Sequence, residues 1–191
     1  MNREQASVLV KLLAAKGVHF AKGLSDEEVI AIQCDFKILF PADLRLFLQT
    51  ALPISNKFVN WREGLNSKSK EDEIQKRLNW PLEGMLFDID ANGFWLDEWG
   101  ERPESFAQQK VIVEQHYQHW PKLIPVYSHR YIPSTPYEEG NPILSVYQTD
   151  IIYYGYDLAD YFSREFSFIL PTIFQVPEQP KAIAFWDNFL A

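Results

Sequence analysis

The stretch from Ile124 to Phe162 constrains the fold most, because it combines the clearest strand, turn and helix-start signals of the chain. It also holds eight of the nine tyrosines. Runs rich in β-branched and aromatic residues are typical of strands, and Asp157 is a good N-cap for a following helix. The elements that we expect here are strands at 123–132, 143–148 and 151–154, a proline-rich loop at 133–142 and a helix at 158–166.

The faces of these strands follow from their alternation. In one strand over 123–132, Tyr127 and Tyr131 share a face with His129. A two-residue turn at Thr149-Asp150 would place Tyr147 opposite Ile152 and Val146 opposite Tyr153 in a hairpin, with Tyr147 and Tyr154 on one face. The turn lacks the Asn-Gly or Asp-Gly pair that would fix this register.

The chain before this stretch reads mainly as helices. Ser25 and Glu28 form a capping-box pattern, and the helix that follows has a wide apolar arc that includes Cys34 and predicts deep packing. Residues 53–69 read as a loop, and the aromatic segment 80–103 as a buried cluster. The expected helices are 3–16, 26–39, 42–51, 69–80 and 104–120, with a short helix around Phe185, Trp186 and Phe189.

Composition bounds the class of protein. The 191 residues are 47% hydrophobic and 15% aromatic, which is enough for one domain with a substantial core. The net charge of −8 disfavours direct nucleic-acid binding and suits a basic partner protein. A single cysteine fits a reducing compartment, and the sequence shows no signal peptide or membrane span. We therefore expect a cytoplasmic α and β domain.

One motif suggests a metal site. Asp88, Asp90, Asn92 and Gly93 follow the first half of an EF-hand calcium loop. The bidentate acid should then fall at residue 99, which is a tryptophan. We expect instead that Asn92 and Gly93 end a helix, and that no metal binds.

Catalytic signals are equally weak. His116 and His119 could share a helix face and hold zinc, but no third ligand stands out. His129 paired with Asp150 could act as a general base, yet there is no nucleophile motif for it to serve. The phosphate-loop, dinucleotide and Gly-x-Ser-x-Gly patterns are absent. We expect no cofactor and no enzymatic activity.

A tyrosine-rich, acidic strand face is the better candidate site. Tyrosine is enriched among binding hot spots, and three or four exposed rings could form the centre of a standard interface. Core packing is the alternative for each ring. The candidate partner-binding residues are Tyr127, Arg130, Tyr131, Glu138, Glu139, Tyr147, Asp150 and Tyr154.

Four segments in order, over most of residues 20–166, resemble the SUKH superfamily, the group related to fungal cell-wall assembly regulators. They are GLSDEEVIAIQCDFKILFPADLRLFL, WPLEGMLFDIDANGFWLDEWGERP, LIPVYSHRYIPS and GNPILSVYQTDIIYYGYDLADYF. The resemblance implies a single α+β domain over 1–191, with N-terminal and central helices packed on a mainly antiparallel sheet. Trp95, Trp99, Gly100, Pro142 and Asp150 match the family pattern.

The resemblance also implies a function. Bacterial members are regarded as immunity proteins that neutralise toxins, often nucleases or deaminases, by stoichiometric binding. We accordingly expect a basic toxin domain as partner. Fungal relatives act as regulatory interaction proteins, so a scaffold with an endogenous partner is the alternative. A small-molecule enzyme or sensor is a further alternative, which would need a deep pocket with converging polar groups, for example around His129.

Overall fold

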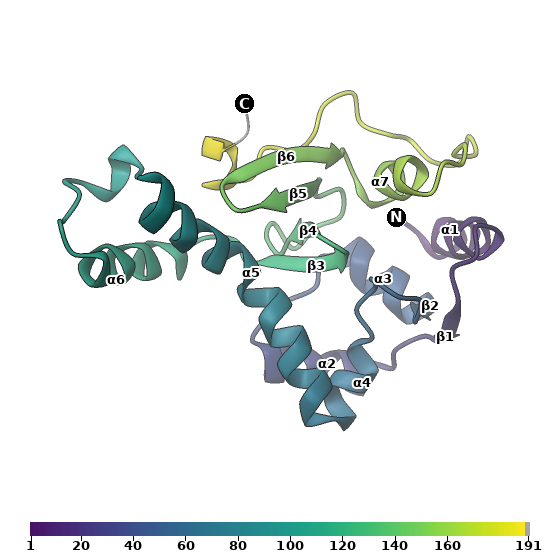
Figure 1. The fold of residues 1–191 in the computed structure, drawn as a ribbon. Coiled ribbons are helices and arrows are strands. Elements are labelled where there is room, and N and C mark those ends of the chain that lie inside the picture. Colours follow the sequence, from purple (N-terminus) through teal and green to yellow (C-terminus); the bar gives the residue numbers. More distant parts are fainter. Residues whose placement is uncertain (190–191) are drawn as a thin grey trace.

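The computed structural model describes residues 1–189, in which seven α-helices and two antiparallel sheets form an α+β fold (Figure 1). This confirms the predicted fold class. The helices are α1 (Arg3–Ala15), α2 (Asp26–Phe36), α3 (Ala42–Thr50), α4 (Trp61–Asn66), α5 (Lys68–Asn92), α6 (Phe106–Tyr117) and α7 (Leu158–Glu165). The strands are β1 (Phe20–Lys22), β2 (Ala51–Pro53), β3 (Leu123–Tyr127), β4 (Arg130–Pro133), β5 (Ile143–Tyr147) and β6 (Asp150–Gly155). Two short 3₁₀ turns, η1 (Asp97–Trp99) and η2 (Trp186–Phe189), complete the described part of the chain.

The larger sheet is a meander with the order β3-β4-β5-β6. The predicted single strand 123–132 is wrong, because Ser128 and His129 form a two-residue turn that folds β4 back on β3. Tyr127 and Tyr131 therefore do not share a strand face. Arg130 pairs with Ser145, two residues before β5 ends, so the β3–β4 and β5–β6 turns lie at the same end of the sheet.

Each face of this sheet covers a separate hydrophobic core. The first core joins one face to the N-terminal helices and α7, and the second joins the other face to the C-terminal half of α5, α6 and the end of the described chain. Members of the first core include Leu9, Val29, Phe47, Trp61, Ile132 and Phe162. Members of the second include Met85, Val113, Trp120, Tyr131, Val146 and Trp186.

Helix α5 is longer than the sequence predicts, because it continues through Pro81 to Asn92. A proline inside a helix removes the N–H that would bond the carbonyl four residues earlier. That carbonyl belongs to Arg77, and it accepts a hydrogen bond of 2.9 Å from the Tyr131 hydroxyl instead. The buried Tyr131 thus replaces the missing helix bond, and Gly93 ends the helix with a φ of 71°.

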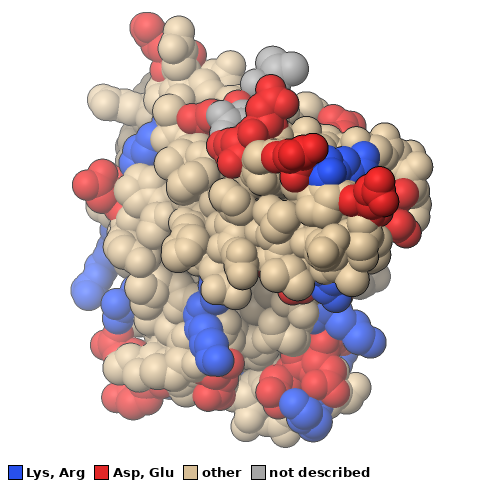
Figure 2. Space-filling model, turned by 90° about the vertical axis from the view of Figure 1, so that its left-hand side faces the viewer, with Lys and Arg blue, Asp and Glu red and all other residues tan. Residues whose placement is uncertain are grey.

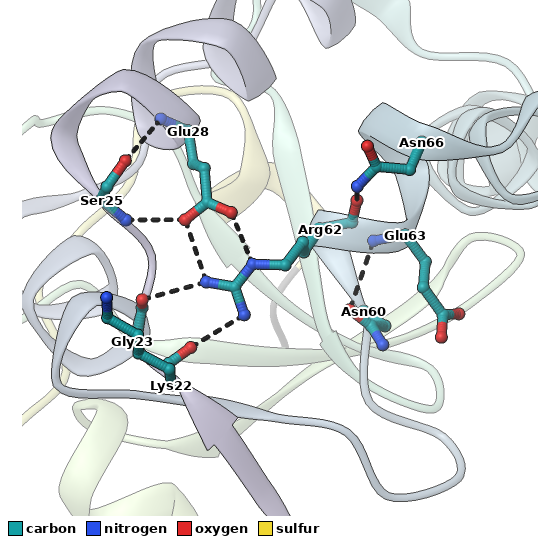
Figure 3. A network of polar contacts seen from close by, with 8 residues as sticks. All are labelled: Lys22, Gly23, Ser25, Glu28, Asn60, Arg62, Glu63 and Asn66. Carbon is teal, nitrogen blue, oxygen red and sulfur yellow. Dashed lines mark hydrogen bonds and ion pairs between the residues drawn. The ribbon is translucent and has the colours of Figure 1, made fainter.

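A polar clamp fixes the N-terminal helices to one another (Figure 3). Ser25 and Glu28 form the predicted capping box at the start of α2. The guanidinium of Arg62, on α4, donates to both oxygens of Glu28 and to the carbonyls of Lys22 and Gly23. These hydrogen bonds lower the pKa of Glu28 to about 2. The clamp therefore joins α2, α4 and the end of β1.

Two further expectations for the N-terminal half are wrong. Residues 53–69 were expected to be a loop, but they contain α4 with its buried Trp61. The wide apolar arc on α2 buries only one of its two stripes, so Ile30 is 58% exposed and Cys34 is also exposed. The reason is that only the Val29 side of α2 faces the first core. No described helix is both long and apolar enough to span a bilayer.

Candidate protein-binding surface

Helix α5 crosses the end of the sheet where the two hairpin turns lie. Its Arg77 guanidinium donates a hydrogen bond of 2.9 Å to the carbonyl of Ser128, in the first turn. About two helical turns further on, Gly84 lies against the second turn, where an added Cβ would approach the Cα of Gln148 to 2.8 Å. The helix therefore holds both turns, and the glycine permits the close approach.

The second turn has a different register from the predicted one. Tyr147 pairs with Asp150, so the turn residues are Gln148 and Thr149 rather than Thr149 and Asp150. Asp88 explains the shift, since its Oδ2 accepts hydrogen bonds from the Thr149 amide at 2.9 Å and from its hydroxyl at 2.6 Å. Gln148 takes a φ of 56° to make this docking possible.

Asp88 is thus a structural anchor, and the half EF-hand motif is part of a helix. Burial raises the pKa of the Asp88 carboxyl, but the hydrogen bonds from Thr149 and Asn92 outweigh it, and the net pKa is lowered. Asp90 lies two residues further along α5, on a different side of the helix, and is exposed. Among residues 1–189, no group of three acidic, His or Cys side chains is arranged to hold a metal ion.

Large apolar side chains surround this docking point and are open to solvent. Tyr147 is 60% exposed and Ile152 50%, at the tip of the β5–β6 hairpin. On α5, Trp80 is 45% and Phe87 55% exposed. These two flank Gly84 at i−4 and i+3, so they lie on the helix face that meets the turn. We define the hairpin–helix surface as Trp80, Phe87, Tyr147, Asp150 and Ile152.

Two of the eight predicted binding residues, Tyr147 and Asp150, are on this surface. They share a sheet face with Ile152, as the pairing of β5 with β6 shows. Tyr154 lies further along the same face, as predicted, but there the face is covered by α7. The exposed part of the face is therefore only the hairpin tip.

Four other predicted residues lie largely in the interior, so they cannot contribute to a free surface. Arg130 is buried under Tyr154, with its guanidinium carbon 3.6 Å from the ring centre. It donates to Ser145 at 2.8 Å and is 3.5 Å from Glu165 of α7. Tyr131 is buried against α5. The half-buried Tyr127 packs on aromatic rings of the first core, Phe58 and Phe166.

The remaining two, Glu138 and Glu139, are exposed on the β4–β5 loop and face a different part of the molecule. Lys181 donates to the Glu139 carbonyl at 2.9 Å and lies 3.7 Å from the Glu138 carboxylate. The Glu139 carboxylate contacts the amino group of Met1. These acids hold the C-terminal segment and α1 beside the loop, so they do not extend the hairpin–helix surface.

The hollow next to this loop has a volume of about 610 Å³, and three carboxylates line it. Asp43 accepts from the backbone amides of Leu44 and Gly140, and Asp157 caps α7. Because both side chains already bind backbone groups, their position is explained by the fold. His129, the other residue considered for a polar pocket, is exposed in the β3–β4 turn beside Ser128.

Trp80 and Phe87 were missed by the sequence reasoning, which placed them near or inside a buried aromatic cluster. The cluster exists, because Trp99 packs on Phe94, Trp95 and Trp120. A signal for the two exposed rings was their spacing of seven residues, which puts them on one face once the helix is known to pass Pro81.

A second exposed apolar face lies on α6, and it is uncharged, unlike the hairpin–helix surface with its Asp150 (Figure 2). The side of the molecule that carries α5 and α6 shows an uncharged band across its middle, with acidic side chains gathered above it. On α6 the exposed apolar residues are Phe106 and Val111, which is 51% exposed.

A scan against protein-family models, a search of curated proteins and a search of solved structures each find no match for the chain.

Proposed function

We propose that this protein is a non-enzymatic binding domain that neutralises a basic toxin domain by stoichiometric association, as an immunity protein does. The observation that carries the proposal is the hairpin–helix surface, where three large aromatic rings and an isoleucine stand open to solvent around one docking point. Exposed apolar groups gathered in this way are typical of protein interfaces, and Trp and Tyr are the usual hot spots.

Charge supports a basic partner. Asp150 belongs to the surface, and Glu83 is exposed on α5 between Trp80 and Phe87. The whole chain has a net charge of −8, which would speed the approach of a cationic toxin domain. The resemblance to the SUKH superfamily, with its immunity proteins against nucleases and deaminases, points to the same class of partner.

The test is co-expression with any toxin encoded by a gene next to that of this chain, with growth as the readout and binding measured by calorimetry. We expect growth rescue and a one-to-one complex. Changing Tyr147 and Ile152 together to serine should weaken binding roughly 30-fold or more and abolish rescue, because each removes an apolar anchor.

A matched control is the pair Ile30→Ser and Val111→Ser, two equally exposed apolar residues outside the surface. This variant should rescue growth like the wild type. Full rescue by the Tyr147 and Ile152 variant, with its fold intact, would contradict the surface. Failure of the wild type to bind any neighbouring toxin, together with capture of a host protein through the same surface, would favour the regulatory scaffold.

A further inference from the structure

A second groove lies away from the hairpin–helix surface and has the opposite charge. Four segments that are distant in the sequence form it: the end of α2, the α6–β3 connection, the β4–β5 loop and the chain before η2. Its volume is about 640 Å³. This is the size of groove that takes a few side chains of a ligand.

The lining combines an aromatic floor with an apolar rim. Trp120 is buried at the floor and stacks on Phe185, with ring centres 5.8 Å apart and planes 16° apart. Leu39, Tyr137 and Phe185 form the rim, and they are 44%, 57% and 38% exposed. Three partly exposed large side chains around one hollow are more than scattered surface apolar residues.

The charge of its lining gives the groove a preference for anionic ligands. Among the described residues, its basic lining consists of Lys37, Lys122 and His119, and no Asp or Glu lines it. Both lysines are exposed, and Lys122 donates a hydrogen bond of 2.8 Å to the Lys37 carbonyl, which holds them at one place. In a chain with net charge −8, a groove whose described lining carries Lys but no Asp or Glu is a local reversal of sign.

Two residues of the lining also have unusual backbone. Phe185 has a φ of 70°, while Lys37, with a φ of 53°, is the left-handed residue that ends α2. A bulky aromatic residue at positive φ is strained, and such strain is held in place by surrounding contacts and often marks a ligand site. Here the Phe185 ring stacks on Trp120 and remains 38% exposed at the groove.

We propose that this groove binds an acidic peptide segment that carries an aromatic or leucine side chain. The apolar rim would take the side chain, and the two lysines would pair with flanking carboxylates. A nucleic acid fits less well, because two lysines in a strongly acidic protein neutralise few phosphates. The groove shares none of its lining with the hairpin–helix surface, so the two proposals can fail separately.

The experiment selects peptides from a random phage-displayed library on the immobilised full chain and measures the enriched peptides by fluorescence anisotropy. We expect enrichment of Asp- and Glu-rich peptides with an aromatic or leucine residue, and affinities that fall as salt rises. Replacing Lys37 and Lys122 with glutamate, or Leu39 and Tyr137 with serine, should each weaken binding about tenfold or more.

Three controls make the outcome decisive. Replacing Lys11 and Lys16 of α1 with glutamate changes the net charge equally and should leave affinity within about twofold. Ile152→Ser should have no effect, and circular dichroism should show each variant folded. The milder pair Lys37→Gln and Lys122→Gln should give an intermediate loss of peptide affinity, because it removes the two charges without reversing them. Absence of enrichment, enriched peptides insensitive to the groove variants, or displacement by a single-stranded oligonucleotide would overturn the proposal.

Discussion

One sheet face is covered in one part and open in another. Beneath α7, the Arg130 guanidinium lies under the Tyr154 ring and 3.5 Å from Glu165, and we call this part the covered end. At the hairpin tip, Tyr147 of β5 and Ile152 of β6 remain open to solvent, and we call this part the open end. The difference shows that residue type and strand alternation decide which face a tyrosine joins, while the neighbouring helices decide whether it is core or surface. The covered end should therefore control stability and the open end binding.

The largest effect should come from Arg130→Met at the covered end. It leaves the partly buried Glu165 carboxylate, whose Oε2 is out of contact with solvent, without its cation. We expect a loss of about 3–4 kcal/mol, the lower part of the range for buried pairs. Urea unfolding measures the loss. The double change of Arg130 and Glu165 to methionine should recover most of it, because no unpaired charge remains. A loss below about 1 kcal/mol for the single change would mean that the covered end does not depend on this pair.

Gly155→Ala tests how closely the sheet and α7 approach each other. An added Cβ would lie 2.5 Å from the Cβ and 2.6 Å from the Cα of Tyr161, so the helix must move. We expect a loss of about 3 kcal/mol by thermal or urea unfolding. Gly84→Ala at the open end is the matched comparison, and its loss should be smaller because alanine favours the helix and the turn can shift. Equal losses would remove the distinction between the two ends.

Asp88→Ala should release the hairpin tip from α5 at a cost of about 2 kcal/mol, because the two Thr149 donors lose their acceptor. The pKa of Asp88 is lowered from 3.8, so its contribution is present above about pH 3.8 and is lost as the pH falls through the lowered value. Stability measured against pH should therefore show the wild type and the variant converging in acid. The exposed Asp90→Ala should match the wild type at every pH.

The smallest effect on stability should come from Tyr147→Ser and Ile152→Ser, each within about 0.5 kcal/mol of the wild type. Both side chains are half exposed or more, so the folded state loses little contact when they are shortened. The same changes carry the largest expected loss of toxin binding. A destabilisation above about 2 kcal/mol would place these residues in the core and contradict the open end.

Local signals were sufficient where local physics decides the structure. The capping box of Ser25 and Glu28, the Asp157 cap and the helix end at Gly93 all appear where the sequence predicts them. Each depends on hydrogen bonds or backbone freedom within a few residues. The mixed α and β content and the β5–β6 hairpin followed from the same kind of signal, whereas the mainly antiparallel α+β arrangement was implied by the family resemblance.

The two hairpin turns and the full length of α5 could not be predicted from local sequence signals. Ser128 and Gln148 adopt positive φ without being glycine or asparagine, because Arg77 and Asp88 of α5 hold their turns from a distance in sequence. The passage of α5 through Pro81 likewise depends on a remote hydroxyl, that of Tyr131. Tertiary contacts, and not the local residue preferences, therefore determine these conformations.

The wrong prediction of one strand over 123–132 also affected the predicted binding site. A single strand over 123–132 places Tyr131 on the same face as Tyr127, whereas the turn at Ser128 and His129 separates them. The prediction also lacks the β3–β4 turn, on which α5 docks. Two residues of the hairpin tip, Tyr147 and Asp150, are among the sequence-predicted candidates, because strand alternation separates them from the apolar residues of the core. The helical half of the surface is not among them, because Trp80 and Phe87 become neighbours of the tip only through Gly84 and Asp88.

Helix α5 has a consequence for how the protein unfolds. Its first half contributes Ile74 to one core and its second half contributes Met85 and Ile89 to the other. A helix shared by two cores couples them, so we expect the opening of one core to favour the opening of the other. The amide protons of Ile74 and Ile89 should thus exchange with deuterium at similar rates, and a partner bound at the middle of the helix should slow exchange in both cores.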